Sequence, residues 1–242
     1  MTFRTAVLCE PGGRPVNEDA CRFFVHGSRG CWAVADGLSA RHGGEIASHV
    51  AVEAVIASFQ CAPDCETDCM RRHIEHANNA ILEKQREAPE FAAMRSTLVA
   101  LVTDGLSVFW GHVGDSRLYR FGGGTLRGQT LDHSVPQALC AAGEIQPAQI
   151  RFHEDRASLL RSLGTGHEVR ASISDPEPLD SSDTFLLCSD GFWEYVTEQE
   201  MEADLNSSSA PEEWLDRMRA RLQARAQDGH DNYSAIAVWR SA

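Results

Sequence analysis

The chain has 242 residues, of which 43% are hydrophobic and 24% are charged, which is the composition of an ordinary globular protein with a sizeable core. Its 22 Lys and Arg residues against 35 Asp and Glu residues give a formal charge of −13, which argues against a nucleic-acid or anionic-membrane surface. No apolar stretch approaches the ~20 residues that span a bilayer, and residues 1–14 lack the long apolar segment of a secretory signal, so we expect a cytoplasmic protein.

The first third of the chain predicts three strands and then two helices. Apolar runs indicate strands near residues 3–9, 20–26 and 30–35. Apolar residues at helical spacing follow in GGEIASHVAVEAVIASF (43–59) and in CMRRHIEHANNAILEKQ (69–85).

Between these two helices, the segment CAPDCETDC places Cys61, Cys65 and Cys69 four residues apart. In one continuous helix they would share a face with His73, and such a cluster could bind a soft metal or form a redox site. The alternative is a loop followed by a helix with incidental thiols. Pro63 favours this alternative because proline interrupts a helix, and no zinc-type pair spacing is present.

The rest of the chain predicts a second block of strands, a polar region of residues 132–168, and a helix before the last strand. The expected strands lie near residues 97–103, 106–113, 117–121, 125–130, 169–174, 183–188 and 233–239, and the expected helix spans residues 211–226. Strands in blocks, with paired helices between them, are typical of a layered α+β domain rather than of alternating βαβ units.

Acidic residues recur where the predicted strands begin or end. They are Glu18, Asp19, Asp36, Asp115, Asp190 and Asp231. Turn chemistry explains any single one, but not the recurrence. Carboxylates that converge at one end of packed sheets repel one another, and a divalent cation relieves that repulsion. Ligand sets made only of oxygen favour magnesium, manganese or calcium over zinc.

Seven segments, in this order, resemble the metal-dependent protein phosphatases, that is, the protein phosphatase 2C type of Ser/Thr phosphatase in its compact bacterial form. The segments are RPVNEDA, VADGLSARHGGEIAS, VGDSRLYRF, DHS, SLGTG, LCSDGFWEYV and DNYSAIAV, and they cover nearly the whole chain. The resemblance implies a single domain over residues 1–242. Its expected fold is an α-β-β-α sandwich of two mainly antiparallel sheets flanked by helices, with a small flap subdomain at approximately residues 132–168.

The resemblance also implies a binuclear centre of Mn²⁺ or Mg²⁺. Asp36 corresponds to the ligand that bridges the two metals, and the Gly37 carbonyl completes one site. Asp190 and Asp231 correspond to further ligands of the first metal, and Asp19 to a ligand of the second.

Two further acidic residues have implied roles at the edge of this centre. Glu18 is expected to reach the second metal through a water molecule. Asp115 matches the carboxylate that, together with Asp190, holds a third and weaker metal in bacterial members.

Arg14 matches the family's phosphate-binding arginine, four residues before Glu18. A guanidinium group suits that role because it grips two phosphate oxygens in a fork. The implied mechanism is attack by a metal-activated water, in which Asp36 and Arg14 are the catalytic residues and no covalent intermediate forms. Cys188 and Ser189 are therefore interpreted as packing and turn residues.

Two departures from the family pattern affect the edge of the site. Ser39, Ala40 and Arg41 stand where members have Gly-Gly-His, so the proton donor to the leaving group is open between His42 and a metal-bound water. In addition, MRSTLVAL (94–101) replaces the usual Gly-Thr-Thr start of that strand.

The sequence therefore predicts a hydrolase, a protein Ser/Thr phosphatase that acts as a monomer on phosphoserine and phosphothreonine. The expected partners are a Ser/Thr kinase or its phosphorylated targets. Two alternatives stay open: a phosphoesterase for small phosphorylated metabolites, and a catalytically silent phosphoprotein-binding domain, which would lack metal carboxylates. A cysteine-dependent phosphatase is disfavoured, because the position six residues after Cys188 is Glu194 and not arginine.

Overall fold

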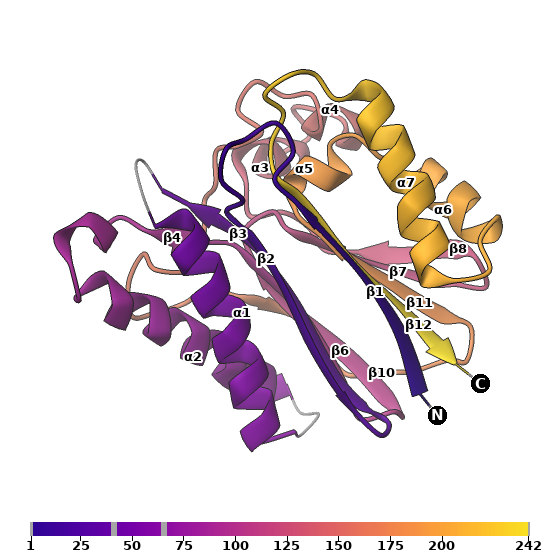
Figure 1. Ribbon diagram of the computed structural model, residues 1–242, viewed down its shortest axis with the longest axis horizontal. Helices are drawn as coiled ribbons and strands as arrows, with labels where there is room; N and C mark the ends of the chain where they lie inside the picture. Colours follow the sequence, from indigo (N-terminus) through magenta and orange to yellow (C-terminus); the bar gives the residue numbers. More distant parts are fainter. Residues whose placement is uncertain (1, 40–42, 64–66, 242) are drawn as a thin grey trace.

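The computed structural model describes residues 2–39, 43–63 and 67–241, and its strands form two stacked antiparallel sheets (Figure 1). The first sheet has the strand order β1 (Thr2–Glu10), β12 (Tyr233–Ser241), β11 (Asp183–Cys188), β7 (Arg117–Gly122), β8 (Thr125–Gln129). The second sheet has the order β10 (Glu177–Pro178), β6 (Ser107–Val113), β5 (Leu98–Thr103), β3 (Arg29–Leu38), β2 (Asp19–His26). Two short strands complete the second sheet: β4 (Arg95–Ser96) pairs with β3, and β9 (Ser172–Ile173) pairs with β6.

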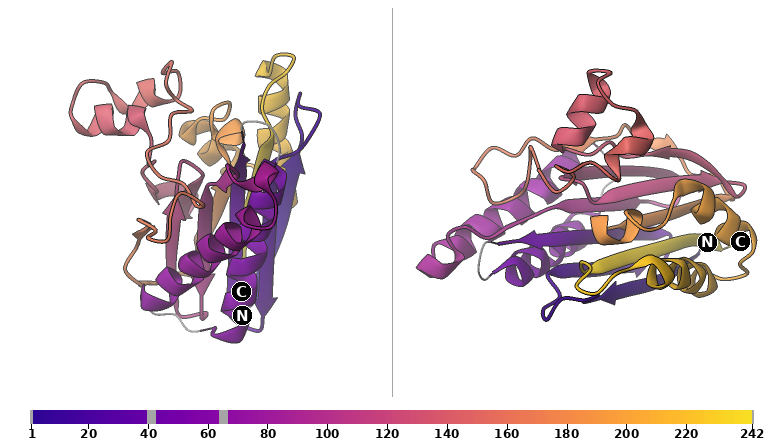
Figure 2. Two further views of the ribbon diagram at one scale, coloured as in Figure 1. Left: turned by 90° about the vertical axis from the view of Figure 1, so that its left-hand side faces the viewer. Right: turned by 90° about the horizontal axis from the view of Figure 1, so that it is seen from above.

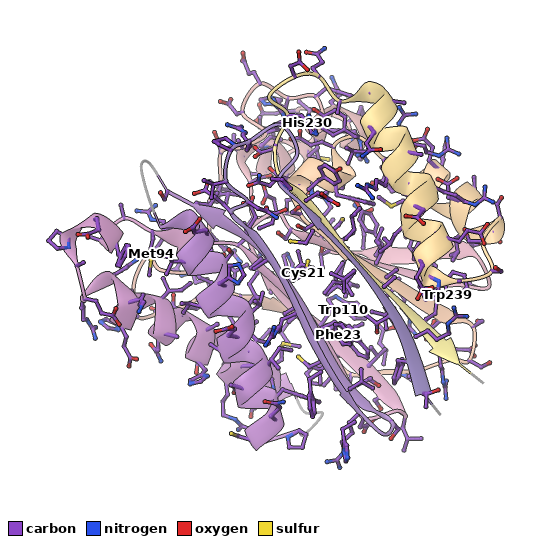
Figure 3. All side chains as sticks on the ribbon, viewed as in Figure 1. Cys21, Phe23, Met94, Trp110, His230 and Trp239 are labelled. Carbon is purple, nitrogen blue, oxygen red and sulfur yellow. The ribbon has the colours of Figure 1, made fainter. Side chains whose placement is uncertain are left out.

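Apolar side chains fill the space between the two sheets (Figure 3). This inner layer includes Trp32, Val34, Leu118, Phe185 and Ile236, all at most 2% exposed. Helices cover the outer faces, so the central strands are buried on both sides. This is why they appear in the sequence as nearly continuous apolar runs.

Each sheet carries two long helices on its outer face, which confirms the predicted α-β-β-α layers (Figure 1). The helices α1 (Gly44–Cys61) and α2 (Thr67–Gln85) pack on the second sheet, and α6 (Glu198–Asn206) and α7 (Pro211–Arg225) pack on the first. None of the helices in the described ranges is long and apolar enough to cross a bilayer.

The structure differs from the predicted elements mainly in its short segments. The predicted strand at 169–174 is reduced to β9, and several short helices were not predicted, among them α5 (Asp190–Trp193) and α6. Helix α6 is mostly polar and contacts the core through Met201 and Leu205, so it lacks a strong apolar period. A capping box between Thr197 and Glu200 starts it instead.

The polar region 132–168, which we call the flap segment, contains two short helices and no strand of its own. These helices are α3 (Val135–Ala141) and α4 (Pro147–Ile150), and they project beyond the sandwich (Figure 2). At the base of the flap segment, Arg117 donates two hydrogen bonds to Asp132, of 2.8 and 2.7 Å, and both side chains are buried. This paired contact joins the flap segment to β7.

The structure agrees with the favoured interpretation of the cysteine segment, in which Cys61 and Cys69 are incidental thiols and do not share one helix face. Cys61 is exposed at the end of α1, whereas Cys69 is buried in α2, so the two lie on different helices. Cys65 lies outside the described residues. His73 of α2 instead contacts α1, because its Nδ1 is 2.8 Å from the Ser58 hydroxyl.

Candidate active site

An open cavity of about 1010 Å³ lies at one end of the sandwich, where the β1–β2 loop, the end of β3 and the start of α5 meet. Most of the predicted site residues line it. They are Arg14, Glu18, Asp36, Gly37, Asp115, Asp190 and Asp231. Asp19 does not line the cavity and is only 2% exposed. Ala40, Arg41 and His42 lie outside the described residues.

Asp19 and Asp36 lie directly opposite each other on the paired strands β2 and β3. Residues in such a position have Cβ atoms roughly 4.5–5.5 Å apart, and like charges there destabilise a sheet. The Asp19 carboxylate accepts a hydrogen bond of 2.6 Å from the Ser189 hydroxyl. Ser189 is therefore more than a turn residue, because it connects β11 to the carboxylate on β2.

The backbone of Asp36 is held on both sides by the start of the next strand pair. Its N–H donates to the Thr97 hydroxyl at 2.9 Å, and its carbonyl accepts from the Thr97 N–H at 2.8 Å and from the Ser96 hydroxyl at 3.0 Å. These bonds fix the end of β3 while the Asp36 side chain borders the cavity. Ser96 and Thr97 belong to the segment that departs from the family's Gly-Thr-Thr, and the hydroxyl side chains preserve this contact.

Asp190 is the first residue of α5, at the point where β11 leaves the core. The next residue, Gly191, has to be a glycine, because the backbone of Asn232 passes so close that a Cβ atom would overlap the Asn232 carbonyl oxygen. The same constraint applies at Gly37, whose missing Cβ makes room for the Gly44 carbonyl. The Asp-Gly pairs of the sequence thus bring two backbone segments together beside the acidic residues.

Burial first, and then the neighbouring charges, disfavour ionisation of these carboxyl groups. Burial raises the pKa of Asp19 to about 7, against the effect of the Ser189 hydrogen bond. Burial and the charge of Asp132 raise the pKa of Asp115 to about 7. The pKa values of Asp36 and Asp190 are raised well above the usual range by burial and by repulsion from the other aspartates.

This oxygen-rich and crowded set suits a divalent cation, which would remove the repulsion that raises these pKa values. Arg14 and Arg95 are the arginines that line the described part of the cavity, so the acidic groups outnumber the cations there. Among residues 2–39, 43–63 and 67–241, no three Asp, Glu, His or Cys side chains already have the spacing of a formed metal site. Most of these carboxylates nevertheless border one common cavity.

Arg14 lies at the rim of the cavity and donates a hydrogen bond of 3.1 Å to Asp231. Both side chains are about half exposed, so this ion pair is screened by solvent and contributes little to stability. A guanidinium group has five N–H donors. Most of the donor capacity of Arg14 is thus open to a ligand.

Asn232 was not predicted as a site residue, yet it anchors the loop that carries Arg14. Its Oδ1 accepts from the Glu18 N–H at 2.8 Å, and its Nδ2 donates to the carbonyls of Pro11 at 2.8 Å and Val16 at 3.0 Å. The Asp-Asn pair before the last strand was the one signal for it, and that signal also fits an ordinary turn.

Comparison with known proteins agrees with this geometry. A family model described as "Protein phosphatase 2C" matches residues 13–232. The chain is 33% identical to the serine/threonine phosphatase stp of Listeria welshimeri over 214 residues, which are 86% of this chain and 83% of that protein.

Two solved structures have the same architecture over nearly the full length of both chains. The serine/threonine phosphatase PstP/Ppp of Mycobacterium tuberculosis matches with a TM-score of 0.85 and 28% identity over 100% of both chains. The catalytic domain of PstP in complex with two manganese ions matches with a TM-score of 0.82 and 27% identity, over 98% of this chain and 97% of that one.

The raised pKa values predict an unusual pH dependence of stability for protein from which divalent cations have been removed. The pKa of Asp19 is higher in the folded state than its ordinary value of 3.8. The contribution of Asp19 to the free energy of unfolding is therefore most favourable below pH 3.8 and is lost as pH rises towards about 7. Between pH 5 and pH 8, ionisation of Asp19 should lower the free energy of unfolding of the wild type by an amount on the order of 2–3 kcal/mol. Asp19→Asn should not show this part of the fall in urea unfolding. Identical pH profiles for the two proteins would contradict the charge crowding.

Replacing Asn232 should loosen the β1–β2 loop. Asn232→Ala leaves the Glu18 N–H and two carbonyls without their partner, so the free energy of unfolding should fall by about 1–3 kcal/mol. Asn206→Ala is the matched control, since Asn206 also makes two hydrogen bonds to carbonyls but is exposed, and its effect should stay within about 0.5 kcal/mol. Equal losses in urea unfolding would show that Asn232 has no special anchoring role.

Proposed function

Because the chain belongs to the protein phosphatase 2C family, we infer that it is a serine/threonine protein phosphatase, a metal-dependent hydrolase of phosphoric monoesters. The main observation in favour of this function is the cavity, which is lined by several crowded aspartates and by Arg14. A phosphate ester is the substrate class that such a site fits, because it needs cations for its charge and a guanidinium fork for its oxygens.

In the proposed centre, Asp36, the Gly37 carbonyl, Asp190 and Asp231 would hold one Mn²⁺ or Mg²⁺, and Asp36 would also serve a second cation. When bound, the cations supply the positive charge that acidifies an attacking water and stabilises the transferring phosphoryl group. The metal-bound structure of PstP contains manganese, which supports Mn²⁺ here.

Three further acidic residues complete the proposed centre. Asp19 is a ligand of the second cation, and its hydrogen bond from Ser189 orients one oxygen and leaves the other for a ligand. Glu18 acts through water. Asp115 and Asp190 form a weaker third cation site. The repulsion between their charges contributes to the raised pKa of Asp190 and is the argument for this assignment.

Arg14 binds the phosphate of the substrate, and its hydrogen bond to Asp231 keeps the guanidinium next to the acidic residues. The cavity wall around it contains apolar side chains from three segments: Ile46 of α1, Phe91 beside β4, and Leu159 of the flap segment. This wall would contact residues that flank a phosphoserine or phosphothreonine. The flap segment, residues 132–168 within the single domain 1–242, is thus part of the substrate site.

We keep the finer expectations as proposals: a Ser/Thr kinase or its phosphorylated targets as partners, a cytoplasmic location, and a monomer. A phosphoesterase for small metabolites would use the same cations and Arg14, and comparing a phosphopeptide with phosphorylated metabolites distinguishes the two. A silent phosphoprotein-binding domain is disfavoured, because the metal carboxylates of the family pattern are present.

The ligand assignment predicts the result of replacing Asp36. Asp36→Asn should reduce turnover of a phosphothreonine peptide at least about 100-fold in the presence of Mn²⁺, while the circular dichroism spectrum stays that of the wild type. Metal affinity measured by calorimetry should fall in parallel. Asp216→Asn makes the same chemical change on the exposed face of α7 and should leave both quantities unaltered. Full activity of Asp36→Asn would remove Asp36 from the centre.

The role of Arg14 predicts a change mainly in KM. Arg14→Ala removes charge-assisted hydrogen bonds to phosphate, so KM for a phosphopeptide should rise about tenfold or more, with a smaller change in kcat. Arg95→Ala removes the same charge from another part of the cavity wall, and steady-state kinetics should give a smaller effect. If the two variants behave alike, the effect is general electrostatics and the specific role of Arg14 is wrong.

A further inference from the structure

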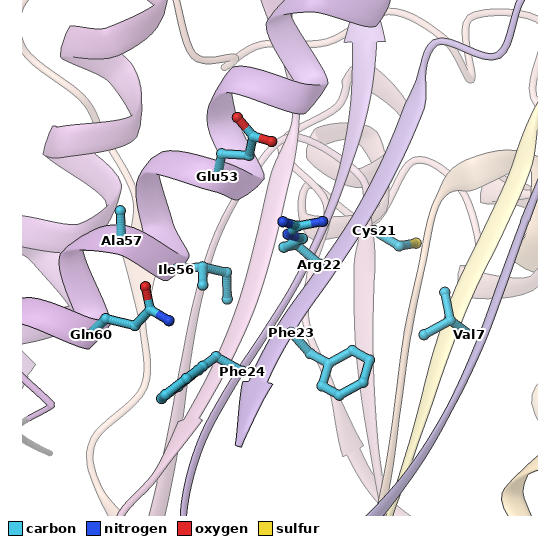
Figure 4. Close-up of a pocket in the computed structure, with 9 residues that line it drawn as sticks. All are labelled: Val7, Cys21, Arg22, Phe23, Phe24, Glu53, Ile56, Ala57 and Gln60. Atoms are coloured by element: carbon cyan, nitrogen blue, oxygen red, sulfur yellow. The ribbon is translucent and has the colours of Figure 1, made fainter. Parts of the chain in front are cut away.

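The two sheets end on the same side of the molecule in neighbouring edge strands, β1 of the first sheet and β2 of the second. A surface groove of about 480 Å³ runs between β1, β2 and α1 and is open to solvent (Figure 4). Cys21 of β2 lines this groove beside Val7 of β1 (Figures 3 and 4). The groove lies outside the cavity of the acidic residues, and its thiol has no part in the phosphatase mechanism.

Cys9 of β1 and Cys21 of β2 lie on neighbouring edge strands, near the end of the one and the start of the other. Each thiol also reaches the backbone of the opposite strand: Cys9 Sγ is 3.8 Å from the Asp19 carbonyl, and Cys21 Sγ is 3.9 Å from the Leu8 carbonyl. Cys9 is exposed and Cys21 is half-buried. Each thiol thus reaches the strand that carries the other thiol, and one of the two is accessible to solvent, which is the arrangement that a disulfide between the strands needs.

The position of this pair in the chain connects it to the site. Cys9 and Cys21 flank the β1–β2 loop, which carries Arg14 and Glu18 and leads directly into Asp19, the first residue of β2. Within the loop, the Asn17 amide donates to Cys9 Sγ at 3.3 Å, and its oxygen accepts from the Asp19 N–H at 3.1 Å. One hydrogen-bond chain thus runs from a thiol to a proposed metal ligand.

We propose that Cys9 and Cys21 are a redox modification site, and that peroxide converts them into a reversible disulfide that regulates the phosphatase. The exposed Cys9 thiol is oxidised by hydrogen peroxide to a sulfenic acid, with release of one water. The Cys21 thiol then attacks that sulfur, the S–S bond forms, and a second water leaves with the thiol proton. A dithiol reductant restores both thiols by exchange.

The disulfide would alter the site through the loop that it closes. An S–S bond of about 2.0 Å draws the two strand ends together and removes Cys9 as the acceptor of the Asn17 amide. Asn17 then loses one of the contacts that orient it beside Asp19. Oxidation should therefore weaken metal binding and lower the rate several-fold, while the cross-link itself stabilises the sandwich edge against unfolding.

The chemical step is tested by peptide mapping of full-length protein treated with hydrogen peroxide. Trypsin releases residues 5–22 as one peptide, because Arg14 precedes Pro15 and that bond resists cleavage. The peptide should be lighter by two hydrogen atoms. After cleavage behind Glu18 its two parts should stay joined until dithiothreitol is added. Separate parts, or over-oxidised Cys9 without a cross-link, would overturn the proposal.

Matched variants test the regulation. Cys9→Ser and Cys21→Ser should each abolish the cross-link and the peroxide-induced loss of Mn²⁺ affinity, whereas Cys140→Ser, in α3 of the flap segment, should retain both effects. A cross-link that forms without any change in Mn²⁺ affinity or rate would refute the regulatory role. This regulatory part rests on the proposed function, but the mapping does not. An inactive protein that still forms the cross-link would count against the phosphatase alone.

Discussion

The cross-strand pair of Asp19 and Asp36 is the contact on which the rest of this site depends. The pairing of β2 with β3 puts two carboxylates opposite each other in a buried place, where burial raises the pKa of both. A sheet with this arrangement is destabilised wherever both groups are ionised. In the proposed centre, a bound cation would relieve this repulsion. Hydrogen bonds from the Ser189 hydroxyl to the Asp19 carboxylate and from the Thr97 N–H to the Asp36 carbonyl hold the pair in position.

The β1–β2 loop brings Arg14, the proposed phosphate-binding group, to this acidic set. Asn232 holds the loop through three backbone contacts, and Arg14 is attached to Asp231 at the cavity rim. The same loop starts and ends at the two sheet edges, next to Cys9 and Cys21. In the proposed redox response, a chemical change at the sheet edge would reach the proposed metal-binding and substrate-binding residues over a short distance. Catalysis and the proposed redox response share one structural element.

Much of this was predictable from the sequence, and the exceptions have clear causes. The long apolar strands and the helices α1, α2 and α7 have strong local periods, and the predicted layers are confirmed. Helix α6 was missed because it is largely polar and contacts the core through few side chains. Pro63 correctly favoured separate segments for Cys61 and Cys69, because α1 ends at Cys61. Local spacing describes a face only where the helix is continuous.

The sequence by itself determined the layers, the family pattern and the acidic positions at strand ends, because residue type and apolar period are properties of neighbouring residues. The tertiary structure alone decided which side chains meet. Ser189 contacts Asp19 across 170 positions, and Asn232 contacts Glu18 across 214. The approach of Cys9 and Cys21 to each other's strands likewise depends on the edges of two separate sheets lying side by side. Such contacts leave no periodic signal in the chain, since they arise from strand register and sheet packing.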